Sequence, residues 1–252
     1  MPSFISEDEI NKCLDIHKDL KSKEFDIGIM SDTPGTGELF ETNIYGNHNL
    51  NIWNSYACEN LNESGFNSLI LSSELSYDEI NELKSKLNTN ISNNANNSNK
   101  NIDNNLNLEL IVHGNLEIMT SNDDFSNLAN QKDLIIKESS DYAILEDKKR
   151  KKFKYKVLFD FNKRSHFRNK DCLCLIEELG KIKSIGLSSI ILDCRFSNET
   201  YTSQIISLYL EGLKNTNKKN LNSLKKEIHS ITHSHLSKGN FLEGRVHEKD
   251  KK

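Results

Sequence analysis

Apolar runs and helix-type patterns alternate along the first 120 residues of the chain. The apolar runs predict four buried strands, at 25–30, 48–53, 68–73 and 108–114. Between them, apolar residues at helical spacing predict helices at 6–22, 55–64 and 77–87. Ser6 with Glu9 has the pattern of a capping box, and Gly65 follows the second helix as a natural stop. Repeated strand–helix alternation predicts parallel strands joined by right-handed crossovers.

The pattern changes beyond residue 140. Residues 141–160 predict two antiparallel strands around a charged turn, and 164–169 predict a short polar turn. A helix at 173–182, a strand at 188–196 and a helix at 200–214 follow. We therefore predict the α/β class, as a partial β/α (TIM-like) barrel with an inserted antiparallel β-hairpin and a polar tail. A whole barrel uses about 250 residues without such additions, and an open sheet is the alternative.

The predicted organisation is one barrel-type domain followed by a polar segment. The domain covers 1–214, with a hairpin insertion at 141–169, and a Lys-, Asn- and His-rich tail covers 215–252. Asn supplies 11 of the 20 residues from 88 to 107. Such a segment cannot bury enough apolar surface to offset its ordering entropy, so we expect a disordered loop there, which we attribute to compositional drift.

Charge and composition argue against several classes of protein, including basic nucleic-acid binders, membrane-spanning proteins and disulfide-stabilised proteins. The chain has 33 Lys and Arg against 37 Asp and Glu, a net charge of −4, which excludes a generally basic nucleic-acid binder. A basic turn at 148–156 leaves only a local, weak candidate for nucleic-acid contact. No apolar run approaches the ~20 residues of a membrane span, and the acidic, polar start differs from a secretory signal. Five cysteines, an odd number, argue against a disulfide framework. We expect a cytoplasmic protein without membrane contact.

Polar side chains follow several predicted strands. In parallel β/α architectures, ligands bind beyond the carboxyl ends of the strands, and a carboxylate, an imidazole and a guanidinium there could form an acid–base site. Each residue also has a structural interpretation: Glu74 as a helix cap, His113 as a loop hydrogen-bonding group, Asn54 as a turn residue, and Asp193 with Arg195 as an ion pair. The residues concerned are Asn51, Asn54, Glu74, Glu109, His113, Asp193 and Arg195.

Three further patterns predict structure rather than chemistry. Cys172 and Cys174 lie in an apolar run and are expected to be buried thiols on a helix face, with metal ligation as the alternative. The glycine-containing loop at 33–37 lacks the lysine of a phosphate-binding loop and predicts a flexible turn. The tail histidines are expected at the surface because no ligand spacing accompanies them; they are His229, His233 and His235.

Several segments, in the same order, resemble the collagenase-like peptidase family U32. They are LNIWNS (50–55), LILSSELSYDEI (69–80), LELIVHGNLEIMTS (108–121), YAILEDKKRKKFKYKV (142–157), RSHFRNKDCLCL (164–175), GLSSIILDCRF (186–196) and SITHSHLSKGNF (230–241). The resemblance implies a β/α-barrel core and a peptidase of unknown catalytic type. Relatives take part in hydroxylating RNA bases or quinone precursors, and some carry a [4Fe–4S] cluster.

The resemblance also assigns site residues. It implies that Glu74, His113 and Arg195 occupy motif positions. If the chain is an enzyme, we expect Glu74 and His113 to be the general acid–base candidates and Arg195 to bind a carboxylate or an oxyanion. The remaining motif positions, expected to contact substrate, are Asn51, Asn54, Glu109, Arg164, His166 and Asn169, with Gly114 beside His113.

The chain departs from the family pattern in two ways, which determine what we expect of its cofactor and its partner. Cluster-bearing members have cysteines just after the His-Gly strand, where this chain has Met119, Asp123 and Asp124. We therefore expect no iron–sulfur cluster, no other cofactor and no metal. The family barrel also begins upstream of the first resembling segment, so the chain resembles the C-terminal half of a member. A half barrel predicts a complementing N-terminal half or a second copy as partner, because it leaves open sheet edges.

From these observations we expect the chain to hydrolyse peptide bonds in a peptide or protein substrate. The sequence alone does not decide whether the chain is an active enzyme. The first alternative is a cluster-less factor in RNA or cofactor modification (hydroxylation). The second is a non-catalytic half that completes a partner chain.

Overall fold

The computed structural model describes residues 5–94, 106–125, 142–146, 154–160, 162–195 and 197–244. The predicted basic turn lies largely outside these residues, and so does most of the Asn-rich segment. The chain forms two compact units, each made of segments that are distant in the sequence. Unit 1 comprises Met1–Ile111, Lys181–Ile191 and Gly239–Lys252; unit 2 comprises Val112–Gly180 and Leu192–Lys238.

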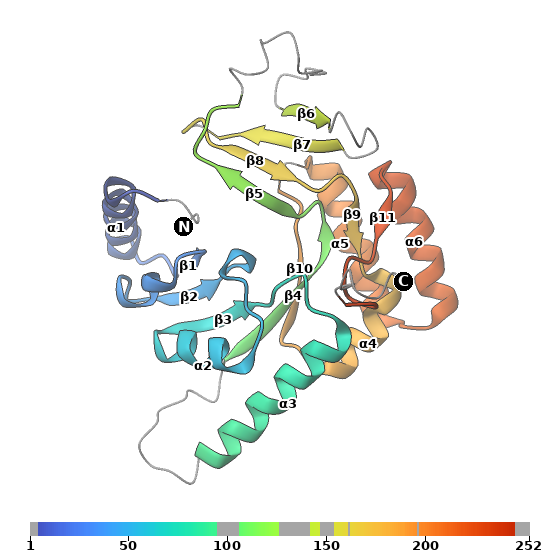
Figure 1. Ribbon diagram of the computed structural model, residues 1–252, viewed down its shortest axis with the longest axis horizontal. Coiled ribbons are helices and arrows are strands. Elements are labelled where there is room, and N and C mark those ends of the chain that lie inside the picture. Colours follow the sequence, from blue (N-terminus) through green and yellow to red (C-terminus); the bar gives the residue numbers. More distant parts are fainter. Residues whose placement is uncertain are drawn as a thin grey trace, which may run out of the picture. The chain divides into compact units, whose positions relative to one another are not determined.

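Unit 1 is built on parallel strands (Figure 1). In spatial order they are β1 (Gly28–Ser31), β2 (Asn43–Gly46), β3 (Phe66–Ile70) and the first part of β4 (Asn107–Gly114), and each neighbouring pair is parallel. A further strand, β10 (Ser189–Leu192), also pairs with β4. Ile44, Leu69 and Leu110 are fully buried on these strands. This arrangement confirms the predicted α/β class with a parallel-rich sheet.

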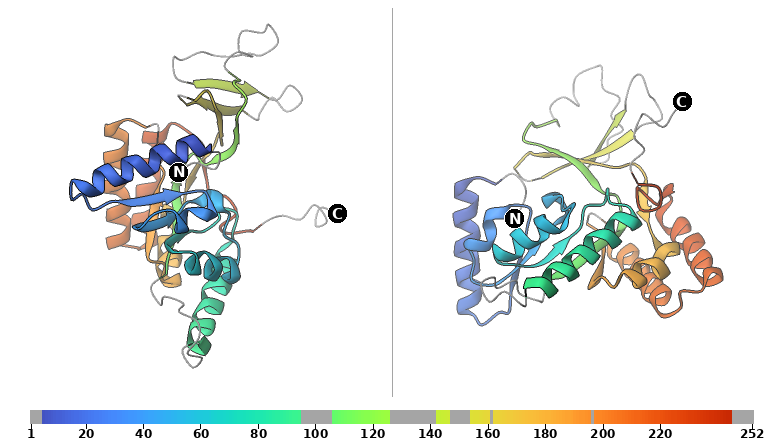
Figure 2. Two further views of the ribbon diagram at one scale, coloured as in Figure 1. Left: turned by 90° about the vertical axis from the view of Figure 1, so that its left-hand side faces the viewer. Right: turned by 60° about the horizontal axis from the view of Figure 1, so that its bottom comes forward.

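The helices of unit 1 begin where the sequence predicts. They are α1 (Glu7–Ser22), α2 (Ser55–Glu63) and α3 (Tyr77–Asn94), and α2 packs against α3 (Figure 2). Ser6 caps α1: its Oγ accepts from the N–H of Glu9, and its own N–H donates to the Glu9 carboxylate, which confirms the capping box. The structure extends α3 to Asn94, so the first residues of the predicted disordered loop are helical.

The predicted strand at 48–53 is wrong. His48–Leu50 form a short 3-10 helix, η2, and Asn51 follows with a left-handed φ of 53°. Only Ile52 makes a strand-type bridge, to Leu71. The second strand is instead β2, at 43–46. A left-handed residue cannot continue a strand ladder, and the alternation of apolar residues in HNLNIW could not reveal that backbone conformation. A second 3-10 helix, η1 (Pro34–Glu38), occupies the predicted flexible turn.

Unit 2 contains a four-stranded antiparallel sheet. Its strands, in spatial order, are β5 (Glu117–Ser121), β8 (Ser165–Arg168), β7 (Lys154–Phe159) and β6 (Tyr142–Glu146). The pairing of β6 with β7 confirms the predicted hairpin. The predicted turn at 164–169 is wrong, because β8 pairs with both β5 and β7. Ala143, Val157 and Phe167 form the buried side of this sheet.

The remainder of unit 2 combines helices with short strands. The elements are β9 (Cys172–Cys174), η4 (Ile176–Glu178), the start of α4 (Leu179–Ile185), α5 (Glu199–Lys214), α6 (Lys218–Thr232) and β11 (Leu236–Ser237). β9 pairs antiparallel with the end of β4 and parallel with β11. Cys172 and Cys174 are buried as predicted, but on a strand rather than on a helix.

The segment predicted as a polar tail contains a packed helix. Leu221, Leu224 and Ile228 are buried on one face of α6. Asn217 caps its start, and its side chain accepts from the N–H of Lys219. None of the helices among the described residues combines the length and hydrophobicity that a membrane span requires.

Candidate functional site

The carboxyl end of β4 lies directly against the residue that follows β10. The backbone N–H of Asp193 donates to the carbonyl of His113 over 2.8 Å. Gly114 has a φ of +130°, and a Cβ at this position would lie 2.4 Å from the carbonyl oxygen of Asp193. Only glycine tolerates both conditions. The strand end therefore brings a buried histidine and a buried aspartate together within unit 2.

Asp193 is a buried carboxylate held by two arginines. Arg168 donates from Nη2 to Oδ2 over 3.3 Å, and Arg195 donates from Nε and Nη2 to the two oxygens, each over 2.9 Å. Burial raises the pKa of Asp193, but the hydrogen bonds and charge of Arg195 and the charge of Arg168 outweigh this effect, so the pKa lies below its ordinary value. The structure thus contains the ion pair that was one interpretation of Asp193 and Arg195.

His166 lies between two carboxylates. Its Nδ1 is 3.2 Å from Oε2 of Glu117, and its Nε2 is 3.4 Å from Oδ2 of Asp160. The hydrogen bond to Glu117 is the main cause that raises the pKa of His166; burial opposes it, and the charges of Glu117 and Asp160 add to it. The His166 side chain is 17% exposed. This imidazole can therefore both hold a proton and reach solvent.

The two carboxylates are fixed by their own surroundings. Burial raises the pKa of Glu117, but hydrogen bonds from His166 and Thr120 and the charge of Arg195 lower it below its ordinary value. Asp160 Oδ1 accepts the backbone N–H groups of Asn162 and Arg164, each over 2.9 Å, in the turn between β7 and β8. The acid–base cluster, defined as Glu117, His166 and Asp160, is thus built from β5, β8 and this turn.

His113 lies in the interior of unit 2 and is 0% exposed. Its Nε2 is 2.8 Å from the hydroxyl of Tyr201 and 3.9 Å from Sγ of Cys172, and Tyr209 packs edge-on against its ring. Burial lowers the pKa of His113 to about 4, against the opposing charge of Asp193. The imidazole is therefore neutral at pH 7, and its Nε2 is hydrogen bonded to the Tyr201 hydroxyl.

In unit 1, Asn51 and Glu74 are connected through Ser72. The Ser72 hydroxyl donates to Oδ1 of Asn51 over 2.8 Å, and the backbone N–H of Glu74 donates to the same hydroxyl over 3.4 Å. The Glu74 residue is exposed in the turn between β3 and α3. It does not cap α3, because Ser76 and the Glu79 carboxylate exchange the capping hydrogen bonds.

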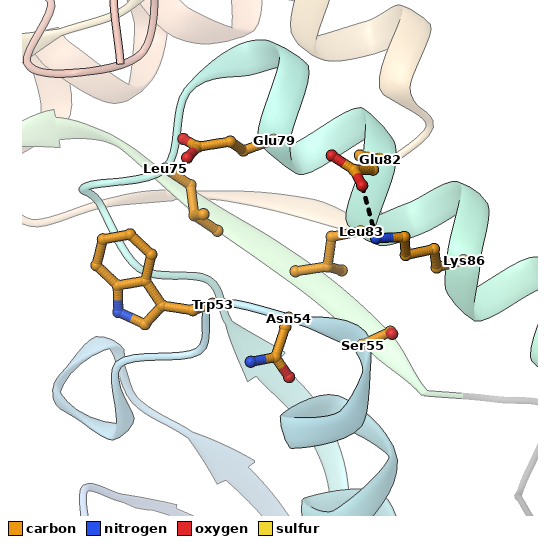
Figure 3. Close-up of a pocket in the computed structure, with 8 residues that line it drawn as sticks. All are labelled: Trp53, Asn54, Ser55, Leu75, Glu79, Glu82, Leu83 and Lys86. Carbon is orange, nitrogen blue, oxygen red and sulfur yellow. Dashed lines mark ion pairs between the residues drawn. The ribbon is translucent and has the colours of Figure 1, made fainter. Parts of the chain in front are cut away.

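Unit 1 also contains a pocket of about 330 Å³ (Figure 3). Asn54 belongs to it and also caps α2, since its Oδ1 accepts from the N–H of Ala57 over 2.9 Å. Trp53 and the start of α2 form one wall, and α3 forms the other. The lining residues are Trp53, Asn54, Ser55, Leu75, Glu79, Glu82, Leu83 and Lys86.

The sequence-predicted residues are therefore divided between the units. Arg164, His166 and Arg195 come together in unit 2 around the acid–base cluster and Asp193, and exposed Asn169 follows β8 there. The sequence-predicted residues of unit 1 are Asn51, Asn54, Glu74 and half-buried Glu109, whereas His113 belongs to unit 2.

Sequence reasoning missed Glu117, Asp160 and Arg168. The available signal was the alternation of side chains in RSHFR: in a strand, His166 and Arg168 face the same side. Interpreting that segment as a turn concealed Arg168 and the partners of His166, which are Glu117 and Asp160.

Among the described residues, no three His, Cys, Asp or Glu side chains are placed to hold a metal ion. Met119, in the segment that follows the His-Gly strand, is 50% exposed on β5. Residues 115–125, which follow the His-Gly strand, contain no cysteine and so offer no thiolate for an iron–sulfur cluster. The expected lack of a cofactor stays a prediction.

Comparison with known proteins agrees with the sequence resemblance. The family model described as peptidase family U32 matches residues 1–251, nearly the whole chain. No curated protein and no solved structure matches the chain. The chain belongs to peptidase family U32.

Proposed function

We propose that this chain hydrolyses peptide bonds, with the acid–base cluster of unit 2 moving the protons. The observation that carries the proposal is the His166 ring, whose two nitrogens lie 3.2 and 3.4 Å from the carboxylates of Glu117 and Asp160. A partly exposed imidazole that is oriented by one carboxylate and has a second one nearby is suited to general acid–base catalysis. Membership of a family described as peptidases supports the reaction class.

In this proposal, His166 transfers the protons that hydrolysis requires. The neutral ring accepts a proton from water as the water oxygen adds to the peptide carbonyl carbon. The protonated ring then donates that proton to the leaving nitrogen as the carbon–nitrogen bond breaks, giving a carboxylic acid and an amine. Glu117 orients the ring through Nδ1, and Nε2, at the longer distance of 3.4 Å from Asp160, is the nitrogen that accepts and returns the proton. The 49%-exposed Arg195 side chain supplies positive charge for a developing oxyanion.

The family resemblance supports further roles. Glu74, exposed in unit 1, remains a proposed acid–base group. Fully buried His113 is proposed to act by positioning Tyr201, to which its Nε2 is hydrogen bonded over 2.8 Å. The proposed substrate contacts are Asn51, Asn54, Glu109, Arg164 and Asn169.

The test is peptide hydrolysis by the purified chain and by His166→Gln. New amino termini released from denatured collagen measure the activity, and we expect the substitution to reduce the rate about 100-fold or more. His229→Gln changes an exposed histidine on α6 and serves as the control. Absence of hydrolysis by the unmodified chain, or unchanged hydrolysis by His166→Gln, would contradict the proposal.

We further propose that the parallel strands belong to a partial β/α barrel completed by another chain. Among the described residues, β1 pairs only with β2, and its Met30 is 45% exposed. An open strand edge with an apolar side chain favours association. Light scattering of the purified chain tests this proposal: a dimer, or a complex with an added N-terminal half, supports it, and a stable monomer that binds no such half contradicts it.

We also propose a cytoplasmic location. All five cysteines are free thiols, which fits a reducing compartment. Microscopy of a tagged chain tests this location, and retention in a secretory compartment would contradict it.

A further inference from the structure

The pocket of unit 1 combines an apolar floor with an aromatic wall. Leu75 and Leu83 are buried beneath it, and the Trp53 indole stands at the side opposite α3 (Figure 3). Its volume of about 330 Å³ falls at the lower end of the roughly 300–1,000 Å³ typical of ligand pockets. The space is therefore large enough for one long side chain.

The rim of the pocket has an excess of negative charge. Helix α3 contributes two carboxylates, Glu79 and Glu82, and one ammonium group, Lys86, which pairs with Glu82 over 2.6 Å. The Glu79 carboxylate is held in place, because its Oε2 accepts the N–H and the hydroxyl of Ser76, each over 2.8 Å. The three charges sum to −1, so the rim favours a cationic occupant.

We propose that this pocket binds the side chain of an arginine residue in a peptide, which deepens the proposed function by naming a substrate class and rests on it for the peptide. The methylene stem of arginine matches the Leu75 and Leu83 floor, and its planar guanidinium stacks on an indole face. The carboxylates of Glu79 and Glu82 complement its charge. A lysine side chain has the same charge but no planar group to stack on the indole. An acidic side chain would be repelled by the two carboxylates.

Trp53 provides a direct readout, because it is the only tryptophan of the chain. The experiment titrates the full chain with N-acetyl-arginine amide and follows tryptophan fluorescence. N-acetyl-citrulline amide is the matched probe, since it has nearly the same shape without the charge, and N-acetyl-lysine amide separates planarity from charge. We expect a saturable change with the arginine probe and dissociation constants about fivefold or more higher for the other two.

Two substitutions on α3 test the charge argument in opposite directions. Glu82→Gln removes a carboxylate and is expected to weaken arginine binding about fivefold. Lys86→Gln removes the competing ammonium and is expected to strengthen it. Glu211→Gln, on α5 of unit 2, is the control and leaves binding unchanged. Far-UV circular dichroism establishes that each variant is folded, so that a loss of binding reports on the pocket.

Equal affinity for the arginine and citrulline probes would overturn the proposal, as would parallel effects of Glu82→Gln and Lys86→Gln. Equal affinity for arginine and lysine would overturn the assignment to arginine. The titration requires no hydrolysis. Saturable arginine binding without peptide cleavage therefore rejects the proposed function alone, whereas cleavage without arginine binding rejects the pocket assignment alone.

Discussion

Nδ1 of His166 lies 3.2 Å from Oε2 of Glu117, and the two side chains come from adjacent antiparallel strands. The hydrogen bond to Glu117 is the largest cause of the raised pKa of His166. Replacing Glu117 with Gln removes the negative charge, so we predict that the pKa of His166 falls. An NMR titration of the histidine ring protons measures this change, with the His166 signal assigned from His166→Gln.

Asp171→Asn is the control for that titration. Asp171 lies 3.4 Å from His235, so its substitution changes the surroundings of a different histidine. The His166 titration is expected to stay the same in this variant. An unchanged or raised pKa of His166 in Glu117→Gln would contradict the hydrogen bond described here.

The same pair predicts a pH window for stability. His166 has a folded pKa above its ordinary value of 6.5, so its contribution is full below about pH 6.5 and is lost as the pH rises through the folded pKa. Glu117 has a folded pKa below its ordinary value of 4.5, so its contribution is present above about pH 4.5 and is lost as the pH falls through the folded pKa. The coupling between the two side chains is therefore largest between these values.

A double-mutant cycle of Glu117→Gln and His166→Gln measures this coupling from urea unfolding. We predict roughly 1 kcal/mol at pH 5.5 and a smaller value at pH 9, where the imidazole carries less positive charge. A coupling energy that is the same at both pH values would mean that packing, rather than charge, connects the two side chains.

We predict that a side chain at Gly114, the last residue of β4, strongly destabilises the protein. Alanine here meets the carbonyl oxygen of Asp193 at 2.4 Å with a φ of +130°, so Gly114→Ala should reduce the free energy of unfolding by at least about 2 kcal/mol. Gly35→Ala is the matched control, because a Cβ at Gly35 meets nothing within 4 Å. Similar urea midpoints for the two variants would contradict the close approach.

Local signals made much of unit 1 predictable from the sequence. The helix starts at Ser6 and Ser76 depend on capping residues within four positions, and the structure has both. The strand at 48–53 failed because its outcome depends on one left-handed residue, Asn51. Apolar alternation carries no information about that backbone angle.

Unit 2 depends more on contacts between distant residues. His166 acquires its partners only when β8 pairs with β5, which places Glu117, 49 residues away, beside its ring. Helix α6 was predictable in principle: Leu221, Leu224 and Ile228 have helical spacing. The surrounding Lys and Asn residues obscured this pattern.

Arg168 is predicted to stabilise unit 2 through the buried charge of Asp193. Arg168→Met leaves that carboxylate buried with one partner fewer, and we expect a loss of about 3 kcal/mol in the free energy of unfolding. Arg195→Met removes two 2.9 Å hydrogen bonds from the same buried carboxylate, so we expect a loss of similar size although the Arg195 side chain is 49% exposed. A loss below about 1 kcal/mol for Arg168→Met in chemical denaturation would contradict the prediction.

His113 is predicted to make the protein sensitive to acid. Burial lowers its pKa from the ordinary value of 6.5 to about 4, so the unfolded chain binds an additional proton at pH values between the two. Stability therefore declines as the pH falls from 6.5 to 4, and for this group the decline amounts to about 3 kcal/mol.

His113→Gln removes the titrating group while retaining a polar side chain near Tyr201. We expect the variant to be less stable at pH 7 but to lose less of its remaining stability on acidification, as measured by urea unfolding at both ends of the range. A pH dependence identical to that of the unmodified chain would mean that His113 is protonated in the folded protein, or that it is open to solvent.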